Sequence, residues 1–260
     1  MAHNLLAQLE NQLINGDEPI LLFQKDNHFI YWVGISNETA FRCNVYLIVD
    51  GDEALVIDPG SRSFFTQIQT NISKVTPLEN VKGLILCHQD PDVAASMIDW
   101  LQFNSNITII SSNRTNVLLP HYGIEEYNFF DICDANYTFS SGKQLQFIEA
   151  PFLHFPGAFT TLDLASHFLL SGDIWAALDI DWKLVVEDFE AHTMNMDLFH
   201  LSYMASNIAA KGFVNKLEGL QIDAILPQHG SVLDSRDVED AKNYLKELRC
   251  GTDIIYGDIS

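Results

Sequence analysis

Six histidine and aspartate residues stand where apolar runs of the sequence end. They are His88, Asp90, Asp92, His154, Asp173 and His229. The apolar runs before them lie at 84–87, 147–150, 169–170 and 222–226, and glycine or proline lies close to each run's end. Ligand-binding residues gather at strand ends, on loops that a rigid sheet positions. Three imidazoles and three carboxylates in this arrangement predict a metal site at one edge of a sheet.

The mixture of nitrogen and oxygen ligands favours iron, manganese or zinc. His88 and Asp90 are two residues apart and can face one metal, whereas Asp92 follows Pro91 and can face a second. Three carboxylates without a cysteine ligand favour the harder iron or manganese. Cys87 is not counted, because adjacent strand residues point to opposite faces. Two ferrous ions with three carboxylates carry a net charge of about +1, and we expect metal binding to stabilise the fold.

Each of these signals is weak by itself. An aspartate at a strand end is usually a turn former or a cap, and a lone histidine there is more often structural than a ligand. The recurrence of the pattern at four successive strand ends favours one shared site over four unrelated structural roles.

The elements predicted around these residues alternate between strands and helices. A helix is predicted at 1–18 and an antiparallel meander at 29–57. Further strands are predicted at 83–87, 107–110, 144–150, 161–163, 167–170 and 222–226, and further helices at 62–73, 93–103, 113–121, 195–210, 212–219 and 235–247. No linker separates the halves, so we predict one α/β domain with sheets inside and helices outside.

Composition excludes several classes of protein. The 260 residues carry a formal charge of −21, which argues against nucleic-acid or anionic-membrane partners because both need a basic surface. No run approaches the roughly 20 apolar residues of a membrane span, and the N-terminus lacks a secretory signal. Four scattered cysteines without CxxC spacing fit thiols in a reducing compartment. We therefore predict a cytoplasmic protein.

The chain from about residue 28 to 250 resembles the metallo-β-lactamase fold, an αββα sandwich. Residues 54–60, ALVIDPG, look like the first motif of that fold, and residues 88–93 stand where its HxHxDH motif lies. More narrowly, the chain resembles the flavodiiron proteins, whose loop reads HxExDH, with Asp90 here in the acidic position. Residues 147–156, FIEAPFLHFP, are similar to their strand leading to the third-motif histidine. The resemblance implies a single domain over 1–260.

The same resemblance implies a non-haem diiron centre. One iron would be bound by His88, Asp90 and His154. The second would be bound by Asp92 and His229. Asp173 would bridge the two irons, together with an oxo or hydroxo group.

This sequence departs from the flavodiiron pattern in two places. Val93 replaces the last histidine of the loop, so the second iron lacks a ligand. The chain stops at Ser260, where flavodiiron enzymes continue into a flavodoxin domain, so we expect no flavodoxin domain and no flavin. His192 or His200 could supply the missing ligand and His28 could lie near the pocket, although structural roles are favoured for all three.

The missing flavin favours binding of dioxygen over its reduction, because flavin normally supplies electrons in that family. The resemblance to oxygen-binding diiron proteins implies a sensor or carrier that binds dioxygen, as a peroxo adduct, in bacterial chemotaxis or nucleotide signalling, with a signalling partner protein. Phe152, Phe155 and Trp175 lie beside proposed ligands and could form a dry wall that shields the adduct.

Two enzymatic functions remain open, although we expect a non-enzymatic sensor. The first is a dioxygen or nitric oxide reductase fed by a separate electron donor. The second is a zinc-type hydrolase in which a metal-bound hydroxide attacks an ester or thioester. Asp90 disfavours the hydrolase, because hydrolases of this fold usually keep a histidine there. Flavodiiron enzymes form head-to-tail dimers, so the resemblance also leaves a homodimer open.

Overall fold

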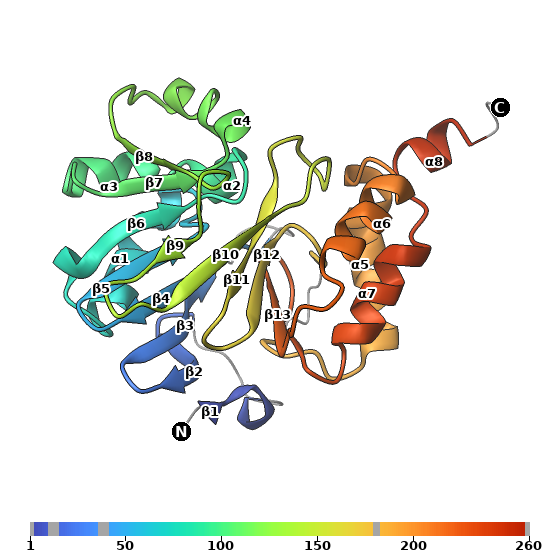
Figure 1. Ribbon diagram of the computed structural model, residues 1–260, viewed down its shortest axis with the longest axis horizontal. Helices are drawn as coiled ribbons and strands as arrows, with labels where there is room; N and C mark the ends of the chain where they lie inside the picture. The colour runs from blue at the N-terminus through green and yellow to red at the C-terminus, as the bar shows by residue number, and fades with distance from the viewer. Residues whose placement is uncertain (1–2, 10–15, 36–41, 179–182, 258–260) are drawn as a thin grey trace.

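Two β-sheets pack face to face at the centre of the computed structural model (Figure 1). The first sheet has eight strands, which neighbour one another in chain order. They are β1 (His3–Asn4), β2 (Ile20–Lys25), β3 (His28–Ile35), β4 (Asn44–Asp50), β5 (Glu53–Ile57), β6 (Val81–Ile85), β7 (Thr108–Ser111) and β8 (Asn128–Asp131). β1 to β5 pair antiparallel, and β5 to β8 pair parallel. The antiparallel meander predicted at 29–57 is confirmed as β3, β4 and β5.

The second sheet has six strands in the order β14-β13-β12-β11-β10-β9. They are β9 (Tyr137–Thr138), β10 (Gln144–Glu149), β11 (Phe159–Asp163), β12 (Phe168–Gly172), β13 (Ala224–Pro227) and β14 (Leu233–Asp234). β12 and β13 pair parallel, and the other neighbours pair antiparallel. Between β12 and β13 the chain leaves the sheet for two long helices, because parallel strands need a crossover connection.

The helices cover the outer faces of the two sheets (Figure 1). On the first sheet they are α1 (Phe65–Ser73), α2 (Pro91–Ala94), α3 (Met97–Phe103) and α4 (Asn113–Asn116). On the second they are α5 (Phe189–Tyr203), α6 (Asn207–Lys216) and α7 (Val238–Glu247). A short helix, α8 (Thr252–Ile255), projects near the C-terminus. Among the described residues, 3–9, 16–35, 42–178 and 183–257, no helix is long and apolar enough to cross a membrane.

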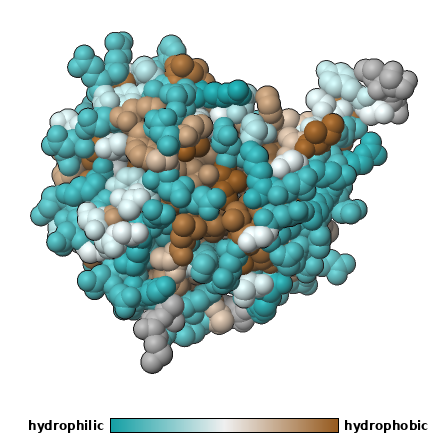
Figure 2. Space-filling view, viewed as in Figure 1, coloured by the Kyte–Doolittle hydropathy of each residue, from teal (hydrophilic) through white to brown (hydrophobic). Residues whose placement is uncertain are grey.

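Three separate hydrophobic clusters hold the four layers together. One lies between the sheets and includes Trp32 from β3 and Phe168 from β12. A second packs the first sheet against its helices, through residues such as Ile68 and Trp100. The third packs the second sheet against α5, α6 and α7. Each sheet therefore buries both faces, which confirms the predicted αββα sandwich. Figure 2 shows apolar atoms gathered in the middle of one face, inside a mostly hydrophilic margin.

The N-terminal segment differs from its prediction. The helix expected at 1–18 is wrong: His3–Asn4 form β1, Leu6–Gln8 form one 3-10 turn, and residues 10–15 lie outside the described part. β1 pairs with β2, a strand that the sequence analysis did not predict. Leu6 is nevertheless fully buried, in the cluster between the sheets. The apolar residues of this segment thus contribute to the core without a long helix.

Candidate metal centre

The six predicted residues all follow strands that end at the same edge of the two sheets. His88 follows β6 by a short loop, and Asp90 and Asp92 lie at the beginning of α2. His154 lies in the turn between β10 and β11, Asp173 follows β12, and His229 follows β13. In the second sheet β10, β12 and β13 run in the same direction, because β10 and β12 both pair antiparallel with β11 and β12 pairs parallel with β13. The packing of the two sheets against each other brings the end of β6 to the same site.

Four of the six side chains form a first group around Asp173 Oδ2. His154 Nε2 lies 2.9 Å from this oxygen, and His88 Nε2 lies 3.2 Å from it. Asp90 Oδ2 lies 3.5 Å from His88 Nε2 and 3.4 Å from His154 Nε2. Two imidazole nitrogens and two carboxylate oxygens therefore converge on one point, which is the donor set of a first metal.

The remaining two residues form a second group on the other oxygen of Asp173. His229 Nε2 lies 3.5 Å from Asp173 Oδ1 and 3.4 Å from Asp92 Oδ2. Asp173 thus offers one carboxylate oxygen to each group, which is the arrangement of a bridging ligand. The structure brings all six predicted residues together, and their role as metal ligands stays a prediction.

Hydrogen bonds from outside the cluster orient its histidines. His229 Nδ1 lies 3.1 Å from the carbonyl oxygen of Arg42, so its Nε2 faces the aspartates. His88 Nδ1 lies 3.0 Å from the Sγ of Cys87, the cysteine that was excluded as a ligand. The backbone N–H of Cys87 donates to Asp58 Oδ1 at 2.9 Å. Contacts of this kind fix the ring orientation of a metal-binding histidine.

Electrostatics within the cluster raise the pKa values of its histidines and lower the pKa of Asp173. Burial disfavours the imidazolium form of His154, but the carboxylates of Asp173 and Asp90 outweigh burial and raise its pKa to about 9. The pKa of His88 is raised well above its usual value for the same reasons. Burial also disfavours the Asp173 carboxylate, but the surrounding imidazoliums hold its pKa well below its usual value. A metal that binds here must displace these protons, so its affinity increases with pH.

Three other histidines lie away from the cluster. His28 is buried at the opposite end of β4, 3.2 Å from both Asp50 and Asp163, so the suggested role near the pocket is wrong. His200 accepts a hydrogen bond from the Trp175 backbone N–H, and burial lowers its pKa to about 4. Neither His192 nor His200 belongs to the potential metal-binding groups of the described residues. Their suggested role as a replacement ligand is not supported.

The aromatic wall of the site comes from α5. The ring centroids of Tyr203 and Phe199 lie 5.8 and 6.0 Å from that of His154, and these two rings stack on each other at 4.6 Å. Of the rings predicted to form the wall, Phe152 is half exposed, and Trp175 donates its indole N–H to Ala241 in α7. Phe199 and Tyr203 lie inside the helix predicted at 195–210, but no signal in the sequence indicates their contact with His154. A role for Phe155 stays a prediction.

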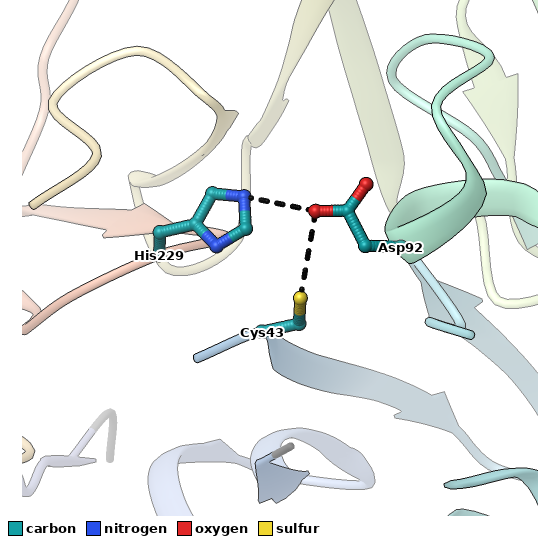
Figure 3. Close-up of side chains that lie close together, drawn as sticks. All are labelled: Cys43, Asp92 and His229. Carbon is teal, nitrogen blue, oxygen red and sulfur yellow. Dashed lines mark hydrogen bonds and ion pairs between the residues drawn. The ribbon is translucent and has the colours of Figure 1, made fainter. Parts of the chain in front are cut away.

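Cys43 is a member of the second group that the sequence analysis missed. Its Sγ lies 3.6 Å from Asp92 Oδ2, and the potential ligand atoms of Cys43, Asp92 and His229 all lie within 4.8 Å of one another. Figure 3 shows the three side chains converging: Cys43 from the position just before β4, Asp92 from α2, and His229 from the loop after β13. No spacing in the sequence connects Cys43 with the other two residues. The signal is the backbone bridge between Cys43 and His229, which exists only in the folded chain.

The two facing sheets, with histidines and aspartates at one shared edge, define this chain as a protein of the metallo-β-lactamase-like fold. A family model described as "ODP family beta lactamase" matches residues 41–230, which include all the cluster residues. The chain belongs to this ODP family.

Known proteins similar to this chain agree with that assignment. A solved structure described as the peroxy diiron species of chemotaxis sensor ODP is 31% identical, with a TM-score of 0.83 over 92% of this chain and 100% of that chain. The flavo-diiron protein FprA2 of Clostridium acetobutylicum is 28% identical over 78% of this chain and 52% of its own length. The anaerobic nitric oxide reductase flavorubredoxin of Enterobacter sp. is 24% identical over 78% of this chain and 43% of its own length. The chain thus spans about half or less of these two curated relatives.

Proposed function

We propose that this protein is a non-haem diiron protein that binds dioxygen and acts as an oxygen sensor or carrier. The observation that carries the proposal is the position of Asp173, whose two carboxylate oxygens face two separate groups of histidines and aspartates. Membership of the ODP family supports iron as the metal, and the similar chemotaxis sensor described as a peroxy diiron species supports dioxygen as the ligand.

The residues present fit a pair of iron ions. His88 Nε2 and Asp173 Oδ1 are buried, and their close contacts are with the other ligand atoms of the cluster, as ion pairs without hydrogen-bond geometry. Buried polar atoms are costly unless they are well paired or coordinate a metal, so these atoms are suited to metal binding. Mixed imidazole and carboxylate donors suit iron. When bound, a ferrous pair supplies two electrons to dioxygen.

The protein's own residues define the environment in which dioxygen would be bound. Phe199 and Tyr203 close the side of His154 with stacked rings. Tyr122 donates its hydroxyl proton to the Gln89 carbonyl oxygen at 2.6 Å, and burial with the nearby aspartates raises its pKa to about 12. This hydroxyl therefore stays protonated and engaged with the backbone. Limited proton delivery favours retention of bound dioxygen over its reduction.

A reductase is the second candidate function, and the flavorubredoxin and flavo-diiron relatives support it. It would use the same residues with electrons from a separate donor, on dioxygen or nitric oxide. The sensor is preferred because the similar sensor chain is matched over its whole length at higher identity. A zinc hydrolase is the least favoured, since Asp90 lies between the two histidines of the first group, where a third histidine would be expected.

The sensor proposal includes partners and a cellular location. Signalling in chemotaxis requires a partner protein, and we propose that this protein acts in the cytoplasm, as a homodimer. The cytoplasm fits the four cysteines, for which the structure shows no disulfide in the part that it describes.

The decisive experiment is anaerobic loading with ferrous iron, metal analysis, and an optical spectrum on mixing with air. We expect two irons per chain and a visible charge-transfer band that persists. The control variant Asp134→Ala should also bind two irons and show the persistent band, because the Asp134 side chain is exposed on the surface. Rapid bleaching with continued oxygen uptake on addition of a reductant would instead identify a reductase. If metal analysis instead finds zinc that iron does not replace, and no visible band forms in air, the hydrolase is favoured.

A further inference from the structure

The two groups of candidate ligands are unequally supplied. In the first, each of the two histidines lies within 3.5 Å of both carboxylates. The second has Asp92 and His229, with Asp173 shared between the groups. Val93, which follows Asp92, is apolar and fully buried in the hydrophobic cluster behind the loop. A metal in the second group therefore needs another donor.

Cys43 lies at the position where that donor is needed. Its side chain is nearly buried, and its Sγ lies 3.6 Å from the same Asp92 oxygen that is 3.4 Å from His229 Nε2 (Figure 3). On the other side of His229, Asp173 Oδ1 is buried and has no hydrogen-bond partner among the described residues. The thiol, the imidazole and two carboxylate oxygens thus face a common space.

The separations of Asp92 Oδ2 from His229 Nε2 and from Cys43 Sγ match those of ligands on one metal ion. Metal–ligand distances at zinc are about 2.0–2.1 Å to nitrogen or oxygen and about 2.3 Å to sulfur. At the tetrahedral angle, an oxygen and a nitrogen then lie about 3.4 Å apart, and an oxygen and a sulfur about 3.6 Å apart. The observed values are 3.4 Å from Asp92 Oδ2 to His229 Nε2 and 3.6 Å from Asp92 Oδ2 to Cys43 Sγ.

A backbone bridge and side-chain hydrogen bonds to the backbone fix the three residues relative to one another. Cys43 and His229 face each other across an isolated antiparallel bridge. The next residue, Asn44, donates its side-chain amide to the carbonyl oxygens of Pro227 and Gly230 at 3.0 and 2.8 Å. The Asp92 carbonyl oxygen accepts from the Gln228 side chain at 3.1 Å. The thiol is therefore directed into the cluster by the fold itself.

We propose that the thiolate of Cys43 is a ligand of the second metal, together with Asp92, His229 and the shared Asp173. The thiol releases its proton to solvent as the sulfur–metal bond forms. The thiolate also adds a negative charge beside the second metal, which partly compensates the charge of the ions.

This inference rests on the proposed metal centre but not on the binding of dioxygen. Its test therefore uses zinc, which neither binds nor reduces dioxygen. The full chain is purified without metal under anaerobic conditions and loaded with two zinc ions per chain. Zinc K-edge X-ray absorption should then show one sulfur neighbour for every two zinc ions, at about 2.3 Å. The absence of sulfur in the unmodified protein would overturn the proposal.

Variants separate a ligand from a hydrogen-bonding neighbour. Cys43→Ala should lose the sulfur signal and weaken the second zinc site by more than the roughly 10–100-fold that loss of an outer partner costs. A smaller weakening would assign Cys43 to orienting Asp92 only. Cys250→Ser is the matched control, because Cys250 is also buried but is not one of the potential metal-binding residues. It should keep both the sulfur signal and the affinity.

The measurement also holds if Cys43→Ala folds poorly, because cobalt loading of the unmodified chain gives a second readout. Thiolate ligation should produce a near-ultraviolet sulfur-to-cobalt band, and its absence would contradict the proposal. Failure of this inference is distinguishable from failure of the proposed function. Two irons with a persistent dioxygen band but no sulfur neighbour would refute the Cys43 ligand alone, whereas a sulfur neighbour without any dioxygen band would refute the sensor alone.

Discussion

Asn44 connects the beginning of β4 with the loop that carries His229, and its removal should loosen both. Its side chain is fully buried. Its Oδ1 accepts from the Trp32 indole N–H at 2.9 Å, and its Nδ2 donates to the Pro227 and Gly230 carbonyl oxygens. Because the indole N–H can only donate, it fixes the orientation of the Asn44 amide.

Asn44→Ala removes these three hydrogen bonds at once. A typical intramolecular hydrogen bond contributes about 0.5–1.5 kcal/mol, and a buried donor that loses its acceptor costs about 1–3 kcal/mol. The buried indole N–H of Trp32 loses the acceptor that Asn44 provides, so the sum lies in the upper part of the range. We expect the free energy of unfolding of the metal-free protein to fall by about 2–4 kcal/mol.

Tyr46→Phe is the matched control. The Tyr46 hydroxyl donates to the Pro227 carbonyl oxygen at 2.8 Å, and this oxygen keeps its bond from Asn44 in the variant. The expected loss is therefore about 1 kcal/mol. Urea denaturation followed by circular dichroism measures both variants, provided that the slope against urea is unchanged.

A second readout connects the hydrogen bonds of Asn44 with the metal centre. Because Asn44 positions the loop of His229, Asn44→Ala should weaken the second zinc site more than the first. A destabilisation of Asn44→Ala no larger than that of Tyr46→Phe, with both zinc sites unchanged, would refute the reasoning that Asn44 positions this loop.

Three further predictions follow from the site. Asp173→Ala should leave a folded chain that binds fewer than two metals, because among the described residues only this carboxylate faces both groups; retention of two coupled irons would contradict the bridging role. Gly172→Ala should lower the melting temperature, because the backbone φ of Gly172 is +57° and an added Cβ would lie 2.7 Å from Cys87 Sγ. An unchanged melting temperature would count against this crowding. The imidazolium of His154 stabilises the metal-free fold fully below its unfolded pKa of about 6.5, and this contribution is lost as pH rises through about 9, so the unfolding free energy measured at pH 6 should exceed that at pH 9.

The six candidate ligands could be predicted because each marks a local event in the sequence. An apolar run ends, a histidine or aspartate follows, and a turn-forming residue lies close by. Asp173 and His229 follow β12 and β13, which are neighbouring parallel strands, so local signals are enough to place these two residues near each other. The approach of His88 from the other sheet depends on the packing of the two sheets. The order of layers could be predicted for a similar reason, since strands buried on both faces read as continuous apolar runs.

Features that depend on distant pairings could not be predicted. Cys43 reaches the cluster only because its strand joins the loop after β13, and the adjacent contact of Asn44 with Gly230 spans 186 residues. The suggestion that His28 lies near the pocket follows from the resemblance to flavodiiron proteins, which have a histidine near the pocket early in the chain. The pairing of His28 with Asp50 and its contact with Asp163 of the other sheet instead place it at the opposite end of β4. The N-terminal leucines have helical spacing, but pairing of β1 with β2 outweighs that propensity.

The centre is positioned mainly by hydrogen bonds that do not use its ligand atoms. Gln228 holds the Asp92 backbone, and Ser171 donates its hydroxyl proton to the Ile174 carbonyl oxygen at 2.7 Å across the turn of Asp173. Asp58 holds the backbone N–H of Cys87, next to His88. Protons on the histidines then neutralise the carboxylates until a metal replaces them. The geometry of the site is thus supported by hydrogen bonds of the surrounding fold, and a metal that binds there replaces the protons of its ligands.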